Sequence, residues 1–180
     1  AYEMHYTKDV QRCTEAFIGL LEVLVRAGAN VNHRQKGFGR TALMYVVRTG
    51  NVTAVTALLE AGASLHLRDT EGWTPLMCCC QNDVVPEEEG GPTADARAAC
   101  CTALINAGAR LDDQNAMGST ALIVACSNPP QLALVQRLVD AGARTDLSAG
   151  NGLSALQMLS RKCGDKDREL AHQCTKVIVG

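Results

Sequence analysis

Apolar and polar positions along the chain follow a helical spacing in short blocks. Residues 52–60 place four apolar side chains on one helical face: Val52, Val55, Leu58 and Leu59. A shorter apolar run at residues 42–47 precedes them, and the two are separated by the turn Thr49-Gly50-Asn51. The pattern predicts two short helices joined by a tight turn.

Particular residues mark where these helices begin and end. Thr41 precedes the first helix, and its hydroxyl oxygen can accept a free backbone N–H of the first turn. Thr74, Thr120 and Ser154 occupy the same place later in the chain. Gly62 follows the second helix, where a left-handed residue is expected. The polar stretch from Ser64 to Trp73 then predicts an extended finger with a turn at its tip.

Two unrelated strings recur with one period, which indicates internal repeats. The strings AGANVN, AGASLH, AGARLD and AGARTD place glycines at positions 28, 62, 108 and 142. Out of phase with them, the strings GRTAL, GWTPL, GSTAL and GLSAL begin at positions 39, 72, 118 and 152. Because the intervals of the two series are nearly equal (34, 46 and 34 residues, and 33, 46 and 34 residues), the chain is predicted to be one array of equivalent helix pairs.

The unit GRTALMYVVRTGNVTAVTALLEAGASLH, residues 39–66, resembles the ankyrin repeat, and the resemblance covers nearly the whole chain. It implies an all-α ankyrin-repeat solenoid of about five stacked helix-turn-helix units with projecting finger loops. The units are expected at about residues 1–38, 39–71, 72–117, 118–151 and 152–180. The partner helix of the first unit is expected within residues 1–10.

The sequence departs from the family's motif at several places. The motif histidine is replaced by Met44, Met77, Ile123 and Gln157, so we expect its side-chain hydrogen bond to be absent from every unit. An inserted loop rich in Pro, Gly and acid is expected at residues 84–96. The third unit turns through residues 128–130, and the fourth carries a polar insertion near residues 161–168.

Charge and composition narrow the classes of partner and the compartment. The formal net charge is −2 and no basic stripe occurs, so no nucleic-acid partner is expected. No apolar run approaches a membrane span and no signal peptide is visible. The nine cysteines include neighbours that rarely pair, so we expect an intracellular, reducing compartment, with the cytoplasm favoured and an organelle left open.

The sequence predicts no catalytic site, metal site or cofactor. No C-x-x-C pair occurs, and Cys79, Cys80 and Cys126 fall where the repeat motif has alanines. Cys101 and Cys174 match the core position of Val55, whereas Cys163 is expected to be exposed. The four histidines form no local pair with a nucleophile or carboxylate, and no phosphate-binding motif is present.

In the ankyrin family, partners usually lie across the finger tips and the first helices. Carried onto this chain, that surface comprises Phe38, Arg40, Arg48, Thr70, Glu71, Trp73, Gln81, Asn82, Met117, Ser119, Ser127, Asn151, Leu153 and Arg161. Four of these, Phe38, Trp73, Met117 and Leu153, either form an exposed apolar strip or pack on adjacent fingers. Trp73 either packs on its neighbouring finger or is the main anchor for a partner.

The implied function is a non-catalytic scaffold or adaptor that binds one or more proteins through a rigid surface. Two alternatives remain open: an accessory structural subunit of a large assembly, and the targeting segment of a longer enzyme. Solenoids need polar outer faces on their end units, and Val179 stands where an earlier unit has Glu60. We therefore expect the array ends to be covered by more chain or by a neighbouring subunit.

Overall fold

The computed structural model describes residues 16, 19–81, 91–127, 129–162 and 168–180, except the side chains of residues 161 and 162. Within these residues the regular elements are helices, and the only strand-like pairing is an isolated bridge between Ser148 and Ser154. Asn82, Asn128, Cys163 and the first-unit partner helix expected at 1–10 lie outside the described residues. The predicted all-α solenoid is confirmed.

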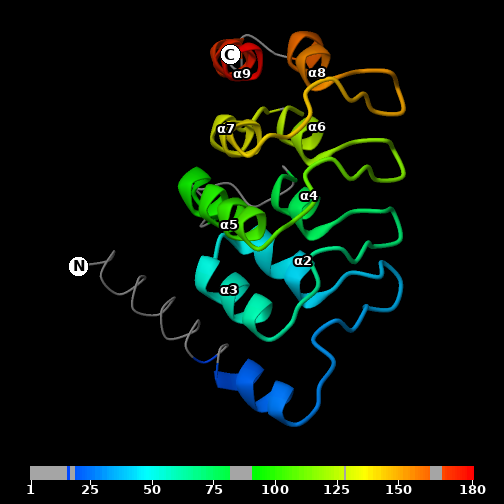
Figure 1. Cartoon of the computed structure of the whole chain (residues 1–180), viewed down its shortest axis with the longest axis vertical. Coiled ribbons are helices and arrows are strands. Elements are labelled where there is room, and N and C mark those ends of the chain that lie inside the picture. The colour runs from blue at the N-terminus through cyan, green and yellow to red at the C-terminus, as the bar shows by residue number, and fades with distance from the viewer. Residues whose placement is uncertain (1–15, 17–18, 82–90, 128, 163–167) are drawn as a thin grey trace, which may run out of the picture.

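The helices stand in two parallel columns (Figure 1). The inner column comprises α2 (Ala42–Val46), α4 (Pro75–Cys79), α6 (Ala121–Ala125) and α8 (Ala155–Lys162). The outer column comprises α3 (Val52–Glu60), α5 (Ala94–Asn106), α7 (Leu132–Asp140) and α9 (Arg168–Val179). A 3-10 turn, η1 (Val47–Thr49), follows α2, and residues 19–26 form a further helix before α2. Each helix packs on the next member of its own column and on its partner across the unit.

Equivalent hydroxyl groups begin the inner helices, as the sequence predicts. The Oγ1 atoms of Thr41, Thr74 and Thr120 accept hydrogen bonds from backbone N–H groups three residues later, at 3.5, 3.4 and 3.3 Å. Pro75 stands at the first helical position of α4, where its missing N–H costs nothing. These equivalent N-terminal caps therefore set the register of successive units.

The positions that replace the motif histidine behave in two ways. Met44, Met77 and Ile123 are fully buried apolar side chains. Gln157 is exposed, and its Oε1 atom accepts a 2.9 Å hydrogen bond from the Ser154 backbone N–H. Since the Gln157 backbone N–H also donates to the Ser154 hydroxyl, the two residues form a reciprocal cap. The expectation that no unit has a side-chain hydrogen bond from this position is therefore wrong for the last unit.

The core between the two columns is built from Leu, Val, Met, Ala and Cys side chains. Val55, Cys101 and Cys174, which share one position in the repeat, are all 0% exposed. Trp73 is the one aromatic side chain of the described residues in this core. Short side chains let the inner and outer helices approach closely, which explains a folded array with so few aromatic residues.

The inserted loop is shorter than the sequence predicts. The Thr93 hydroxyl accepts a 3.1 Å hydrogen bond from the Ala96 backbone N–H, and α5 begins at Ala94. The last three residues assigned to the loop are therefore helical, because the threonine supplies a cap. Pro92 then lies over the turn of the preceding unit, where a Cβ added to Gly50 would come within 2.7 Å of its Cβ. Gly50, with a φ of 70°, is thus required by both its conformation and its neighbour.

We predict that Thr120→Ala lowers the free energy of unfolding by about 1 kcal/mol, because α6 loses its N-terminal cap. Thr53→Ala, an exposed substitution within α3, is the matched control and should have little effect. Urea denaturation followed by circular dichroism measures both variants. Equal stability of the two variants would show that the hydroxyl of Thr120 does not hold the helix start.

Candidate partner-binding groove

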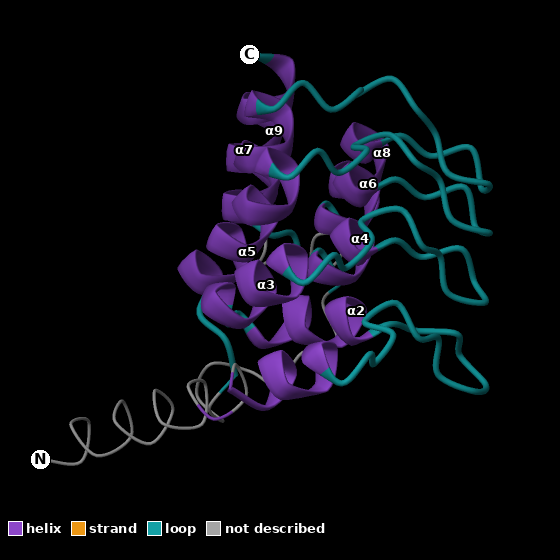
Figure 2. Ribbon diagram, turned by 60° about the horizontal axis from the view of Figure 1, so that its bottom comes forward, coloured by secondary structure: helices purple, strands orange, loops and turns teal. Residues whose placement is uncertain are grey.

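The finger loops all project from the inner-helix side of the stack (Figure 2). One side chain braces the second finger from within. The Asp69 Oδ1 atom accepts hydrogen bonds from the backbone N–H groups of Glu71 and Trp73, both at 2.9 Å. In the third finger, Asn115 Oδ1 accepts equivalent bonds from Met117 and Ser119, at 3.0 and 2.9 Å. An oxygen acceptor at this position therefore gives these two finger tips the same shape.

Backbone hydrogen bonds join each finger to the next. The backbone N–H of Thr70 donates to the Phe38 carbonyl at 2.9 Å, and that of Ala116 donates to the Glu71 carbonyl at 2.8 Å. The N–H of Gly150 donates to the Met117 carbonyl at 2.7 Å. These three bonds occupy the same place in successive units, so the fingers form one continuous ridge.

Long side chains make a second set of links nearer the base of the fingers. Arg34 Nη2 donates to the Arg68 carbonyl at 2.8 Å, and Arg68 Nη1 donates to the Gln114 carbonyl at 2.7 Å. Gln114 Nε2 continues the series to the Ser148 carbonyl at 3.0 Å. Each link reaches the equivalent carbonyl of the following unit, which fixes the spacing between fingers.

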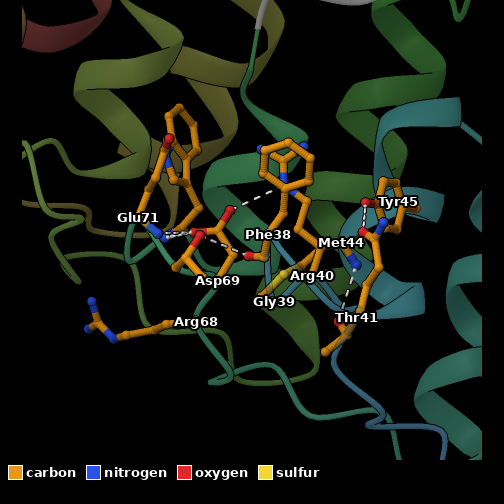
Figure 3. A network of polar contacts seen from close by, with 12 residues as sticks. Phe38, Gly39, Arg40, Thr41, Met44, Tyr45, Arg68, Asp69 and Glu71 are labelled. Carbon is orange, nitrogen blue, oxygen red and sulfur yellow. Dashed lines mark hydrogen bonds and ion pairs between the residues drawn. The ribbon is translucent and has the colours of Figure 1, made fainter.

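The charged side chains of the fingers are largely paired with one another. The Nε atom of Arg40 lies 3.1 Å from Asp69 Oδ2, and Figure 3 shows these two side chains between the first two fingers. Arg68 pairs with Asp113 at 2.9 Å, and Arg144 pairs with Asp146 of its own finger at 2.6 Å. The Asp69 side chain is only 2% exposed, so its charge depends on Arg40 for compensation.

An open groove of about 570 Å³ lies between the finger ridge and the inner helices of the later units. Its volume falls within the usual range of ligand-binding clefts. Six residues of the predicted partner surface line it: Trp73, Gln81, Met117, Ser119, Ser127 and Asn151. The groove thus brings together finger and helix residues that are up to 78 positions apart in the sequence.

The other predicted surface residues whose side chains are described do not line this groove. Phe38 and Arg40 belong to the first finger, with the Arg40 guanidinium 6.0 Å from the Phe38 ring centre. Thr70 and Glu71 form the exposed tip of the second finger, Arg48 is half-buried in η1, and Leu153 is half-buried beyond the fourth tip. Asn82 lies outside the described residues, as does the side chain of Arg161, whose backbone belongs to α8.

The predicted apolar strip is not continuous. Phe38 and Met117, which precede the turn glycines, are 62% and 57% exposed. Trp73 follows a turn glycine and is 7% exposed, and Leu153 at the equivalent place is half-buried. The residue after the glycine returns into the finger stack, where its N–H is held by the bracing oxygen. Trp73 is therefore a packed residue that also lines the groove, and its role as an anchor for a partner stays a prediction.

Comparison with known proteins agrees with this architecture. Residues 13–86 match the sequence model of the family described as ankyrin repeats (3 copies). The chain carries ankyrin repeats. The later units repeat the caps, turn glycines and finger contacts of the matched segment, so the ankyrin array extends through the described residues to α9.

Three curated proteins illustrate the relatives of this ankyrin array. The chain is 42% identical over 60 residues to putative ankyrin repeat protein L271 of Acanthamoeba polyphaga mimivirus, covering 33% of this chain and 8% of that protein. It is 41% identical over 59 residues to human palmitoyltransferase ZDHHC13, covering 33% and 10%. It is 43% identical over 44 residues to human protein phosphatase 1 regulatory subunit 27, covering 24% and 29%. The chain therefore aligns with less than a third of each relative's length.

Sequence reasoning missed four residues that line the groove of the ankyrin array: Val124, Ala149, Gly150 and Met158. Val124 and Met158 occupy equivalent places in their units, four positions after the caps Thr120 and Ser154. This spacing from the cap could have identified both residues as part of the surface. Ala149 and Gly150 carry no such signal, because they reach the groove only through the hydrogen bond from Gly150 to the third finger.

A second hollow of about 310 Å³ lies at the first-unit end of the array. Leu21, Leu24 and Val25 line it from the helix of residues 19–26, and Tyr45 and Leu58 line it from the next unit. The Tyr45 hydroxyl donates a hydrogen bond to the Gln35 side chain at its rim. Its walls are mainly aliphatic.

The cysteines of the described residues are core side chains. Seven cysteines are outside any disulfide and at most 2% exposed: Cys78, Cys79, Cys80, Cys100, Cys101, Cys126 and Cys174. Burial raises the pKa of the Cys100 thiol from its ordinary 9.0 to about 11, and burial also raises that of Cys126. Among the described residues, no cluster of His, Cys, Asp and Glu could hold a metal ion.

We predict that Arg40→Ala lowers the free energy of unfolding by about 2 kcal/mol, because it leaves the buried Asp69 carboxylate without its cation. Adding Asp69→Asn should recover most of this loss, since an amide can brace the finger as Asn115 does. Thermal denaturation of the single and double variants measures the coupling. A double variant no more stable than Arg40→Ala would contradict the role assigned to the ion pair.

We also predict that the seven buried thiols resist iodoacetamide in the native protein at about pH 8. At that pH a thiol with a pKa of about 11 is ionised in roughly one molecule per thousand. Mass spectrometry of the alkylated peptides gives the measurement, with protein unfolded in guanidinium chloride as the control. Rapid native labelling of Cys100 would show that its thiolate is accessible.

The same pKa shift has a consequence for stability. Because the folded state favours the neutral Cys100 thiol, its contribution to stability is complete below about pH 9 and is lost as pH rises through about 11.

Proposed function

We propose that the protein is a non-catalytic scaffold or adaptor that holds a protein partner in the groove between its finger ridge and inner helices. Ankyrin repeats are a protein-interaction module, and six of the fourteen predicted surface residues line the groove. The observation that carries the proposal is the bracing of one wall of this groove by hydrogen bonds between fingers, in which Ala116 donates to Glu71 and Gly150 donates to Met117.

A preformed surface favours binding because little conformational entropy is lost when the partner docks. Ser119 and Trp73 are held by the finger braces, and Val124 is 8% exposed within α6. Met117 and Asn151 project from these fixed supports and are exposed. The arrangement combines a rigid base with a few side chains that can adjust to a partner.

The names of the relatives are compatible with an adaptor role but do not identify a partner. One of them is named a regulatory subunit of a phosphatase, and another is named a palmitoyltransferase. An accessory subunit of an assembly and a targeting segment of a longer enzyme are therefore both compatible with the alignments. No helix among the described residues is both long and apolar enough to cross a bilayer.

We predict that Met117→Glu reduces capture of the partner at least tenfold, because it places a charge on the groove wall without disturbing the core. The measurement is affinity purification from cells of the source organism, with quantitative mass spectrometry. Thr53→Glu on the exposed face of α3 is the matched control and should retain the partner. Circular dichroism confirms that both variants stay folded.

The outcomes of this experiment separate the remaining alternatives. Loss of one protein in the Met117→Glu sample alone supports an adaptor that uses the groove. Loss of several proteins in fixed proportions supports a subunit of a larger assembly. An identical set of captured proteins in all three samples would contradict the groove as the binding surface.

A further inference from the structure

Most sulfur-containing side chains of the described residues are shielded from solvent. The seven cysteines are at most 2% exposed, and Met44 and Met77 are at most 1% exposed. Met158 is half-buried on α8. Met117, at the tip of the third finger, is 57% exposed. An oxidant in solution therefore reaches the thioether of Met117 more readily than any other sulfur atom of the described residues.

The buried thiols compete poorly for the same oxidant. Cysteine reacts as the thiolate, which needs both access and a low pKa. Burial raises the pKa of the Cys100 thiol to about 11, and burial also raises the pKa of Cys79 well above its ordinary value. Because these thiols are neutral and enclosed, we expect the described cysteines to react with a peroxide more slowly than Met117 does.

The third finger holds the backbone of Met117 independently of its side chain. The Met117 N–H donates to Asn115 Oδ1 at 3.0 Å, and the Met117 carbonyl accepts a 2.7 Å hydrogen bond from the Gly150 N–H. The equivalent positions, each one residue before a turn glycine, carry Phe38, Glu71 and Asn151. Since the other fingers form without a thioether at this position, a chemical change to the exposed Met117 side chain leaves the fold intact.

We propose that Met117 is a site of reversible oxidation by hydroperoxides and that its sulfoxide weakens partner binding at the groove. The thioether sulfur attacks one peroxide oxygen, so that an S–O bond forms as the O–O bond breaks. With hydrogen peroxide, the released hydroxide takes the proton from the new S–OH group and leaves as water. The sulfur loses two electrons and the peroxide gains them. Methionine sulfoxide reductases reverse the oxidation.

The effect on binding rests on the proposed function, whereas the reaction at the sulfur atom does not. Met117 lines the groove together with Trp73 and Met158. Oxidation replaces the apolar thioether with a polar S=O group, which loses water when a partner covers it. Capture of the partner should therefore fall as Met117 is oxidised and should recover when the sulfoxide is reduced.

Timed exposure of the full chain to hydrogen peroxide, followed by peptide mapping with mass spectrometry, tests the reaction. We expect Met117 to be oxidised at a rate within about threefold of its rate in guanidinium chloride, because its side chain is exposed in the folded state. Met44 and Met77 should react at least about tenfold more slowly than Met117. Circular dichroism should show an unchanged helical signal when Met117 alone is oxidised.

Affinity purification with the oxidised chain as bait tests the effect on binding. The bait is freed of peroxide before it meets the lysate of the source organism, and each variant is compared with its own untreated sample. Oxidation should lower capture by the wild type at least about fivefold. Methionine sulfoxide reductases should restore capture, whereas dithiothreitol alone, which reduces disulfides but not sulfoxides, should not. Met117→Leu, which has a similar volume and no sulfur, should show no loss on peroxide treatment.

Each part of the proposal has a result that would overturn it. Oxidation of Met44, Met77 or a buried cysteine as fast as that of Met117 would reject the assigned site. Unchanged capture by the Met117 sulfoxide, with capture lost in Met117→Glu, would reject the effect on binding and leave the groove as the binding surface. Full capture by both would contradict the proposed function together with that effect. An equal loss in peroxide-treated wild type and Met117→Leu would place the sensitive side chain elsewhere.

Discussion

The hydrogen bonds between neighbouring fingers are the contacts on which the remaining geometry depends. Each one joins a carbonyl beside a turn glycine to a backbone N–H of the following finger, at 2.7–2.9 Å. They occur because the helices beneath are in register, and that register is set by the hydroxyl caps. If one unit were rotated or shifted, its finger would lose these bonds and its inner helix would lose its packing partner. The start of each inner helix and the position of its finger are therefore both fixed by the register between successive units.

The same constraint determines where charge can lie. Fingers held at a fixed spacing bring Arg40 next to Asp69 and Arg68 next to Asp113. Pairing along the ridge uses these charges to hold one finger against the next. The bracing position shows how this can vary. Asp69 has Arg40 beside its second oxygen, whereas the Nδ2 atom of Asn115 is buried and has no hydrogen-bond partner among the described residues.

Much of the fold follows from local sequence signals. The hydroxyl caps, the glycines after the outer helices and the spacing of Val55 and Leu58 are short-range features, so periodicity alone locates the helix pairs. The start of α5 at Ala94 was missed because acid, Pro and Gly residues nearby outweighed the weaker cap signal of Thr93. The reciprocal cap of Gln157 was not predicted because this position was compared only with the histidine of the family motif.

The groove could be predicted only in part, for a physical reason. Whether a finger residue is exposed depends on which side of the turn glycine it stands, and Met117 and Trp73 differ in this way although both are large and apolar. The pairing of charges depends on still longer-range contacts. Arg68 and Asp113 are 45 residues apart, and the irregular insertion lies between them. A property of the surface that depends on the alignment of separate units can be recognised only once their spacing in three dimensions is known.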